Sequence, residues 1–332
     1  MDIISIVISF FAGAITCCIG SVWVFILCAI TCLISVVTNN GIFVSQAFGP
    51  LLNPCCNFLA GCVAAGYANR RGYNEGNNTL ADNFLILGKP DVIIVGGIAA
   101  AISWILYVLL GMLGLAGFDA CGSSIFLVAL AARIIFEGNP FGTESEETKK
   151  AGGRFSLNNP VCYFKPWRRL MGKTVIGIAY GGFCAIAMYA LVNAGIDPGV
   201  AALFGFAFGC TILMFPGIPG NHCVGVTVAN ALMVVYSTPA DYSSVNFFPI
   251  VIWGIGIGTL SIYITDFVAD AFSNYGKTMV DAVAGSIMFT TLIIAVFVNL
   301  LNMKSFVFPI VCFVICTVIG IMRERRWKEA AA

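Results

Sequence analysis

Apolar runs of about 20 residues, the length that an α-helix needs to cross the hydrocarbon core of a bilayer, follow one another through almost the whole chain of 332 residues. The strands of a transmembrane β-barrel would instead give alternating segments of about ten residues. Hydrophobic residues make up 59% of the chain and charged residues only 10%, too few to cover the surface of a water-soluble domain of this size. The sequence therefore predicts an all-α polytopic membrane protein.

These runs divide into eleven expected transmembrane helices. Residues 3–37 contain no polar loop, so two short helices that turn at Gly20 or one long tilted helix would fit. The corresponding part of the second half contains a clear turn at residues 193–199, which favours two helices. The expected spans are Ile4–Gly20, Ser21–Val37, Asn53–Ala68, Asp91–Leu115, Cys121–Phe136, Thr174–Asn193, Gly199–Met214, Asn221–Tyr236, Phe247–Phe267, Val283–Leu301 and Phe306–Met322.

The loop cations lie almost all on one side of the membrane when eleven helices are drawn. By the positive-inside rule this side is the cytoplasm. We therefore expect a multi-pass protein of the cell (plasma) membrane with its N-terminus outside and its C-terminus inside, and only Lys304 among the loop cations on the outer face. The cytoplasmic cations are Arg70, Arg71, Lys89, Lys149, Lys150, Arg154, Lys165, Arg168, Arg169, Lys173, Lys277, Arg323, Arg325, Arg326 and Lys328.

Two stretches rich in Gly and Pro, residues 48–56 and 215–223, stand where expected helices begin and resemble one another. A shift of 168 positions aligns Gly49 with Gly217, Asn53 with Asn221, and Cys55 with Cys223. Residues 119–125 resemble residues 281–287 in the same way, at the starts of the fifth and tenth spans. The two halves are therefore interpreted as copies of one unit of five spans.

An odd number of spans per copy requires that the two copies lie upside down relative to each other. Inverted repeats of this kind are typical of transporters, whose solute sites lie at the repeat interface near the membrane midplane. The expected organisation is a first repeat at residues 1–138, a cytoplasmic polar loop at 139–173, an inverted second repeat at 174–302, and an extra helix with a basic cytoplasmic tail at 303–332.

Each Gly/Pro stretch ends in residues that suit a helix start. Asn is a preferred N-cap and Pro a preferred first helical residue. A helix that begins inside the membrane exposes free N–H groups and a positive dipole end, which lipid cannot satisfy. Two converging starts predict a pocket for a small polar solute or a monoanion. The expected solute-binding residues are Asn53, Pro54, Cys55, Gly220, Asn221, His222 and Cys223.

A simpler interpretation of the same stretches stays open. Gly and Pro often end loops and allow close helix packing in membrane proteins without contributing to a pathway. His222 can equally be a packed residue that is hydrogen-bonded to a backbone carbonyl group. Two copies of the broken stretch at matching positions favour the pathway interpretation, because paired discontinuous helices indicate a transporter site.

Acidic residues near helix ends are the candidates for coupling transport to H⁺ or Na⁺. They are Asp119, Asp266, Asp270 and Asp281. Asp119 and Asp281 occupy matching positions at helix N-termini, where Asp is an ordinary cap, which favours a structural role for these two. Arg133 and Glu137 are spaced as an i,i+4 pair and are expected to extend to the membrane interface.

The predicted function is membrane transport, by a secondary transporter (permease) or a channel. A membrane-embedded enzyme with Cys55, Cys56 or Cys223 as nucleophile and His222 as base stays open, as does a membrane subunit of a larger complex. No H-E-x-x-H or G-x-S-x-G motif is present, so an enzyme is not expected. The expected partners are the lipid bilayer and a small polar solute. Coupling to H⁺ or Na⁺ and assembly into a homo-oligomer stay open. No cofactor, metal or nucleic-acid partner is expected.

The expected layout of eleven spans, an outer N-terminus and a five-plus-five inverted repeat is similar to that of the ammonium transporters. The paired pore histidines of that family have no counterpart, because the chain contains one His. The Asn53–Pro54 pair resembles the Asn-Pro of aquaporin half-helices, whereas the second copy reads Asn221–His222. Both resemblances concern architecture, and no residue role is carried over from either family.

Overall fold

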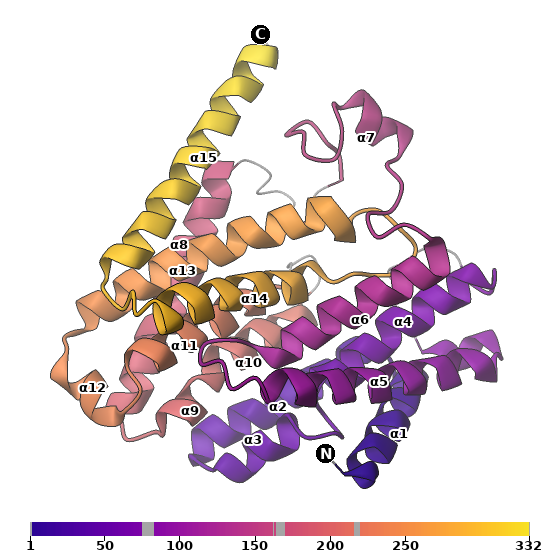
Figure 1. Cartoon of the computed structure of the whole chain (residues 1–332), viewed down its shortest axis with the longest axis horizontal. Coiled ribbons are helices and arrows are strands. Elements are labelled where there is room, and N and C mark those ends of the chain that lie inside the picture. Colours follow the sequence, from indigo (N-terminus) through magenta and orange to yellow (C-terminus); the bar gives the residue numbers. More distant parts are fainter. Residues whose placement is uncertain (1, 75–82, 162, 164–169, 216–219, 332) are drawn as a thin grey trace.

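The computed structural model describes residues 2–74, 83–161, 163, 170–215 and 220–331, and within these ranges every regular element is a helix (Figure 1). Seven helices are long and apolar enough to cross a membrane, so the chain is a polytopic helical membrane protein. They are α2 (Ser21–Thr38), α5 (Pro90–Gly111), α6 (Ala120–Glu137), α8 (Leu170–Asn193), α13 (Phe247–Val268), α14 (Ala282–Ile293) and α15 (Val307–Ala331). Two π-helical segments, η3 (Ala269–Ser273) and η4 (Ile294–Leu300), extend α13 and α14.

The other expected spans coincide with shorter helices, so the count of eleven membrane crossings stays a prediction. These helices are α1 (Ile3–Ile19), α4 (Pro54–Arg70), α9 (Pro198–Ala201), α10 (Leu203–Thr211) and α11 (His222–Val235). Gly20, with φ of 110°, separates α1 from α2, which confirms the prediction of two helices there. The 3₁₀ helix η2 (Ile212–Met214) ends the expected span Gly199–Met214. The elements that the sequence did not predict are α3 (Gly41–Ala47), α7 (Glu146–Lys150), α12 (Pro239–Ser244) and η1 (Phe84–Leu87).

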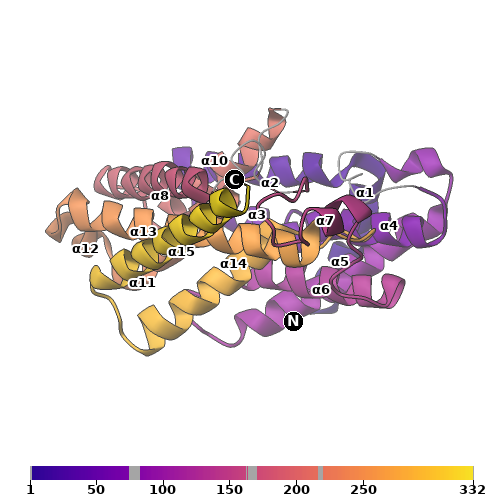
Figure 2. The same cartoon turned by 90° about the horizontal axis from the view of Figure 1, so that it is seen from above.

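The helices form two sets with the same pattern of contacts. In the first set α1 packs on α4 and α5, and α5 packs on α6; in the second set α8 packs on α11 and α13, and α13 packs on α14. Between the sets, α2 contacts α10 and α6 contacts α14. Figure 1 shows the first set, from indigo to magenta, beside the second set, from pink to orange. Helix α15 lies outside α8 and α13 (Figure 2).

Glycine allows the closest helix contacts within each set. A Cβ atom placed on Gly177 of α8 would lie 2.8 Å from Thr259 Oγ1 of α13, and one placed on Gly181 would overlap the carbonyl oxygen of Gly254. In the first set, a Cβ atom on Gly13 of α1 would lie 2.9 Å from the carbonyl oxygen of Gly96 in α5. Small residues at such contacts let helix backbones approach closely, which gives van der Waals attraction where lipid offers no hydrophobic driving force.

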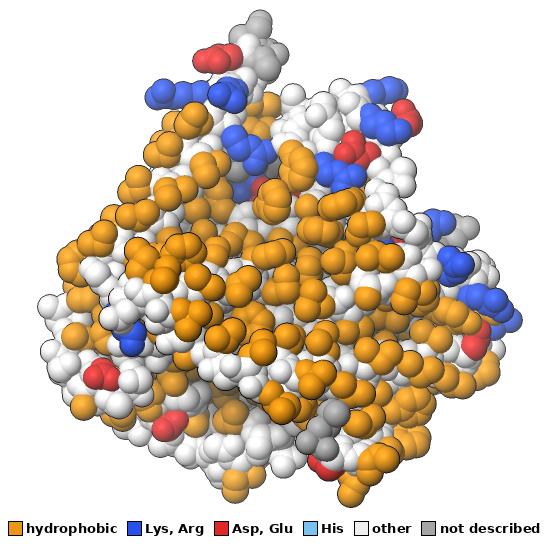
Figure 3. Space-filling model, viewed as in Figure 1, with side chains coloured by type: hydrophobic (Ala, Val, Ile, Leu, Met, Phe, Trp, Pro, Cys, Tyr) orange, Lys and Arg blue, Asp and Glu red, His pale blue; other side chains and the backbone are white. Residues whose placement is uncertain are grey.

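The outer surface is apolar over a wide area. Figure 3 shows a broad band of hydrophobic side chains, with Lys and Arg side chains gathered at the edge beside α7 and the end of α15. On α15, for example, Val314 and Ile315 are each at least half exposed. An apolar surface of this extent suits contact with lipid. The choice of membrane and the orientation of the termini stay predictions.

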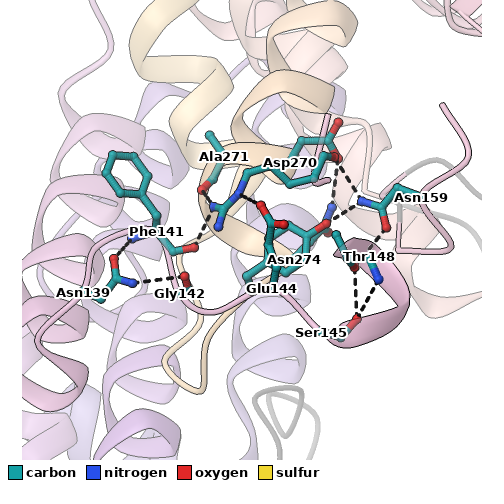
Figure 4. A network of polar contacts seen from close by, with 12 residues as sticks. Asn139, Phe141, Gly142, Glu144, Ser145, Thr148, Asn159, Asp270, Ala271 and Asn274 are labelled. Atoms are coloured by element: carbon teal, nitrogen blue, oxygen red, sulfur yellow. Dashed lines mark hydrogen bonds and ion pairs between the residues drawn. The ribbon is translucent and has the colours of Figure 1, made fainter. Parts of the chain in front are cut away.

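The polar segment after α6 folds against the end of α13 instead of extending freely (Figure 4). Arg154 donates from Nε to Glu144 at 2.7 Å, and from another guanidinium nitrogen to the carbonyl oxygens of Phe141 and Ala271. The Arg154 hydrogen bond lowers the pKa of Glu144. This ion pair is therefore complete at neutral pH, and it is lost only as the pH falls through that lowered pKa. Helix α8 begins at Leu170, before the expected start of the sixth span at Thr174, and the domain boundaries stay predictions.

Arg133 does not reach the membrane interface, so that prediction was wrong. Its side chain is fully buried and donates to the carbonyl oxygens of Thr278, Phe272 and Pro140. Glu137 accepts hydrogen bonds from the backbone N–H groups of Lys277 and Thr278 instead of pairing with Arg133. The segment before α14 packs over this end of α6. The carbonyl groups of this segment therefore accept the hydrogen bonds that Arg133 would donate to water at an exposed interface.

We expect the Gly181→Ala variant to be about 1–3 kcal/mol less stable than the wild type, because the added methyl group overlaps the backbone of α13. The neighbouring Gly182 is the matched control, because a Cβ atom there has Ile255 Cγ1 as its nearest neighbour at 3.7 Å, an ordinary contact. Thermal unfolding of both variants in one detergent measures the difference. Equal unfolding temperatures for Gly181→Ala and Gly182→Ala would contradict the described packing.

Candidate functional site

The first broken stretch forms a hydrogen-bonded corner between α3 and α4. Asn53 caps α4 as predicted, since its Oδ1 accepts from the backbone N–H of Cys55 at 3.0 Å. The same oxygen accepts from Cys121 Sγ at 3.1 Å, and Asn53 Nδ2 donates to the carbonyl oxygen of Phe48 at 2.8 Å. Asn53 is completely buried and uses its whole amide group inside the protein. Its role in this structure is to hold the start of α4 against α6.

The second broken stretch has a different arrangement from the first. Residues 216–219, including Gly217 of the sequence alignment, lie outside the described residues. Asn221 precedes α11 but makes no capping hydrogen bond, so that part of the prediction was wrong. Its ψ of 10° departs from the extended conformation in which an N-cap side chain reaches the first turn. Asn221 is buried, and its Oδ1 has no hydrogen-bond partner among the described residues.

A cavity of about 150 Å³ lies between the two sets of helices, beside both broken stretches. Residues of α2, α4 and α6 from the first set and of α10, α11 and α14 from the second set line it. Most of the lining is apolar, and the large side chains include Phe25, Phe48, Phe58, Phe206, Ile125 and Ile287. These phenylalanines are the largest group of lining residues that no sequence pattern predicted.

Two carboxyl groups line the cavity, and both cap helices as expected. Asp119 Oδ1 accepts from the backbone N–H of Gly122 at 2.6 Å at the start of α6. Both oxygens of Asp281 accept from backbone N–H groups at the start of α14, those of Val283 and Ala284. Neither aspartate takes part in an ion pair with a residue that the structure describes. Each therefore brings a carboxyl group to the cavity, and its hydrogen-bond partners among the described residues are helix N–H groups.

His222 is the most polar ring in the cavity wall. Its ring packs edge-on against Phe25 and Phe206, with centroid distances of 5.1 Å and 6.1 Å. The side chain is 8% exposed, and in the described part of the chain no group bonds to its Nδ1. The alternative in which His222 bonds to a backbone carbonyl through Nδ1 is therefore not observed. A buried ring nitrogen without a partner is uncommon in proteins and calls for an explanation.

The structure brings four of the predicted site residues to this cavity: Pro54, Asp119, His222 and Asp281. The others do not line it. Cys55 and Cys223 each follow a lining residue on a helix, where a step of about 100° turns the side chain away. Cys223 Sγ instead lies 3.4 Å from Thr265 Oγ1 of α13. Asn53, Gly220 and Asn221 lie in the backbone corners before the helices, and Gly220 accepts a hydrogen bond from Tyr163 through its carbonyl oxygen.

The two remaining acidic candidates lie away from the cavity lining. Asp266 forms a buried ion pair with Lys173 of α8. Asp270, in the π-helical segment η3, accepts a hydrogen bond from Asn274 Nδ2 at 3.1 Å. Their contacts join α8, α13 and η3, so they stabilise the second set of helices, and a coupling role for them stays a prediction.

Asn230 is a polar lining residue that the sequence analysis missed. It lies two turns after His222 on α11, and its Nδ2 donates to the carbonyl oxygen of Val226 at 2.9 Å. The only available signal was its helical spacing from His222, eight residues, which places both on one face of the helix. That signal was weak because the same face also carries apolar residues.

The comparisons with known proteins supply no activity. The model of a family of unknown function (DUF7973) matches residues 1–152, which contain α1 to α7. No curated protein and no solved structure matches the chain.

We expect Asn53→Leu to lower the free energy of unfolding by about 1–3 kcal/mol, because a buried carbonyl and a buried N–H group lose their partner. Asn221→Leu is the matched variant at the equivalent position. It should lower the free energy of unfolding by a smaller amount, because Asn221 makes no capping hydrogen bond. Thermal unfolding of the two variants in one detergent compares them. A larger loss in Asn221→Leu would contradict the assignment of Asn53 as the structural corner.

Proposed function

We propose that the protein is an integral membrane transporter or channel that moves a small polar solute through the cavity between two inverted repeats. The match to a family of unknown function and the apolar helices leave this function to be tested. The sequence predicted transport, and we now propose the cavity as the pathway.

One observation carries the proposal: matching positions of the two halves line the same cavity. The shift of 168 residues pairs Pro54 with His222 and Phe58 with Val226, and a shift of 162 pairs Asp119 with Asp281, Gly122 with Ala284, and Ile125 with Ile287. All ten residues belong to the lining. A cavity built from both copies at equivalent positions is the place where transporters with repeated architecture hold their solutes.

The crossing of α6 and α14 supports the inverted relationship of the copies. The backbone N–H of Asp119 donates to Thr291 Oγ1 at 3.1 Å. Further along α6, a Cβ atom on Gly122 would lie 2.7 Å from Ile287 Cγ2, and Phe126 packs against Gly285. Residue numbers rise along α6 while they fall along α14, so the two equivalent helices run antiparallel. Equivalent helices run in opposite directions when the repeats are inverted.

The contacts lend no support to the alternative of a Cys/His enzyme. His222 faces the cavity, whereas Cys223 contacts Thr265 and Cys55 lies against Cys56. Cys121 does line the cavity, and its Sγ donates to Asn53 Oδ1. A nucleophile needs a base within hydrogen-bond reach, and no Cys–His hydrogen bond is present among the described residues.

Flux measurements on proteoliposomes test the proposed pathway. Wild-type protein should raise the permeation of at least one solute from a panel of small amines, amides, alcohols and carboxylates above that of protein-free vesicles. In Ala229→Phe this flux should fall at least about tenfold, because one phenyl ring nearly fills a cavity of 150 Å³. The reason is geometric, since Ala229 lies in the lining.

Leu292→Phe is the control for this experiment, because Leu292 is 42% exposed on α14 and lies outside the lining. It should keep wild-type flux. Unchanged flux in Ala229→Phe would place the pathway elsewhere. Permeation equal to that of empty vesicles for every solute would overturn the transport proposal.

A further inference from the structure

We propose that the cavity binds a small organic cation of the alkylamine class. This inference rests on the proposed function, since it names the solute class for the same cavity. The sequence predicted a polar solute or a monoanion. This inference replaces the monoanion with a polar solute that carries a positive charge. Four properties of the lining support it: size, aromatic walls, charge and hydrogen-bonding capacity.

The size of the cavity limits the ligand to a few non-hydrogen atoms. A protein cavity of about 150 Å³ holds a molecule about as large as benzene. A bare metal ion would leave most of this space empty, and the two carboxyl groups among chiefly hydrocarbon walls fall short of the roughly six oxygen ligands that hard cations take. A short alkyl group attached to one polar head matches both the volume and the apolar surface.

Aromatic rings form one wall of the cavity. Phe25 is the centre of this group, with ring centroids 5.3 Å from Phe58 and 5.8 Å from Phe206. Phe48 lies 5.6 Å from Phe206 in the same cluster. The faces of such rings attract cations through their quadrupole, and the attraction grows when the cation is removed from water. The hydrocarbon part of an alkylamine is also favourably buried against phenyl rings.

Every charged side chain that the described residues contribute to the lining is acidic. Asp119 and Asp281 supply carboxyl groups, and no described Lys or Arg belongs to the lining. Elsewhere in the described core, the buried Asp266 has a compensating charge, because it forms an ion pair with Lys173. Burying a carboxylate without a partner in a membrane protein is unfavourable, and a bound cation removes this penalty. A bound anion would add repulsion from the two aspartates.

Two acceptor atoms on lining residues have no hydrogen-bond partner in the described part of the chain. Asp119 uses Oδ1 for its cap, and its Oδ2 has no partner among the bonds that the described residues make. His222 Nδ1 is a second group without a partner in that part of the chain. An ammonium group provides donors and no acceptor, so it complements a carboxylate and a neutral imidazole nitrogen. An alcohol of the same shape would satisfy only one of these acceptors.

Three probes of nearly equal shape and different charge test the inference: isobutylamine, isobutanol and isobutyrate. Binding is measured on the purified full-length chain in detergent at neutral pH, by calorimetry and by the shift in unfolding temperature. We expect isobutylamine to bind at least about tenfold more tightly than isobutanol, since a carboxylate close to a cation supplies more than 1.4 kcal/mol even at the effective dielectric of a protein surface. Isobutyrate should not bind.

The Asp119→Asn variant isolates the charge, because Asn is as good an N-cap as Asp and keeps the start of α6 intact. It should lose the preference for isobutylamine over isobutanol. Asp197→Asn is the matched control, because Asp197 caps α9 in the same way and lies outside the lining. It should bind isobutylamine as the wild type does. Phe25→Leu should weaken the binding of the amine more than that of the alcohol.

Equal affinity for amine and alcohol, an amine preference that persists in Asp119→Asn, binding of isobutyrate, or no binding of any probe would each overturn the inference. Proteoliposome flux separates this result from the transport proposal. Amine binding without flux would leave the solute class intact and refute transport. Flux of a neutral or anionic solute without amine binding would support transport and refute the alkylamine as the solute class.

Discussion

The antiparallel crossing of α6 and α14 is the contact on which the rest of the structure depends. The helices touch where Gly122 meets Ile287 and Gly285 meets Phe126, so small residues let two bulky side chains pack across the interface. Because the crossing lies close to both N-termini, each helix start faces the interface between the halves instead of ending in a loop outside it. The cavity occupies the space beside this crossing, with Ile125 and Ile287 in its lining.

The two similar Gly/Pro stretches of the sequence have different roles in the structure. In the first copy Asn53 satisfies the backbone at the corner, and its side chain is fully used. In the second copy Asn221 makes no capping bond, and His222 stands where the first copy has Pro54. Equivalent positions therefore give an apolar ring on one side of the cavity and a polar ring on the other. The cavity is therefore lined asymmetrically, although the two stretches are similar in sequence.

Charged side chains have different partners at the cavity and at the polar edge of the molecule. At the edge, Arg133 donates to three carbonyl groups, and Lys173 neutralises Asp266. At the cavity, the partly buried Asp119 and the buried Asp281 accept hydrogen bonds from helix N–H groups and form no ion pair with a described residue. The partial positive charge of a helix start stabilises a carboxylate but does not neutralise it. This difference explains why a cationic ligand suits the cavity and why the edge needs none.

The sequence by itself determined the class of fold and the positions of the helices, because the length of an apolar run and the signals at its ends are local properties. It also predicted the turn at Gly20 and the caps at Asn53, Asp119 and Asp281, since capping involves neighbours along the chain. Arg133 shows the limit of this reasoning, because its spacing from Glu137 predicted a surface pair.

Only the tertiary structure decided which side chains share the cavity. The phenylalanines come from segments far apart in the chain, and no spacing relates Phe25 to Phe206. Likewise, Pro54 and His222 face the cavity while the adjacent cysteines do not, because the rotation of each helix is set by its packing partners. A pattern along the chain places a residue on a helix, but contacts between helices determine what that residue faces.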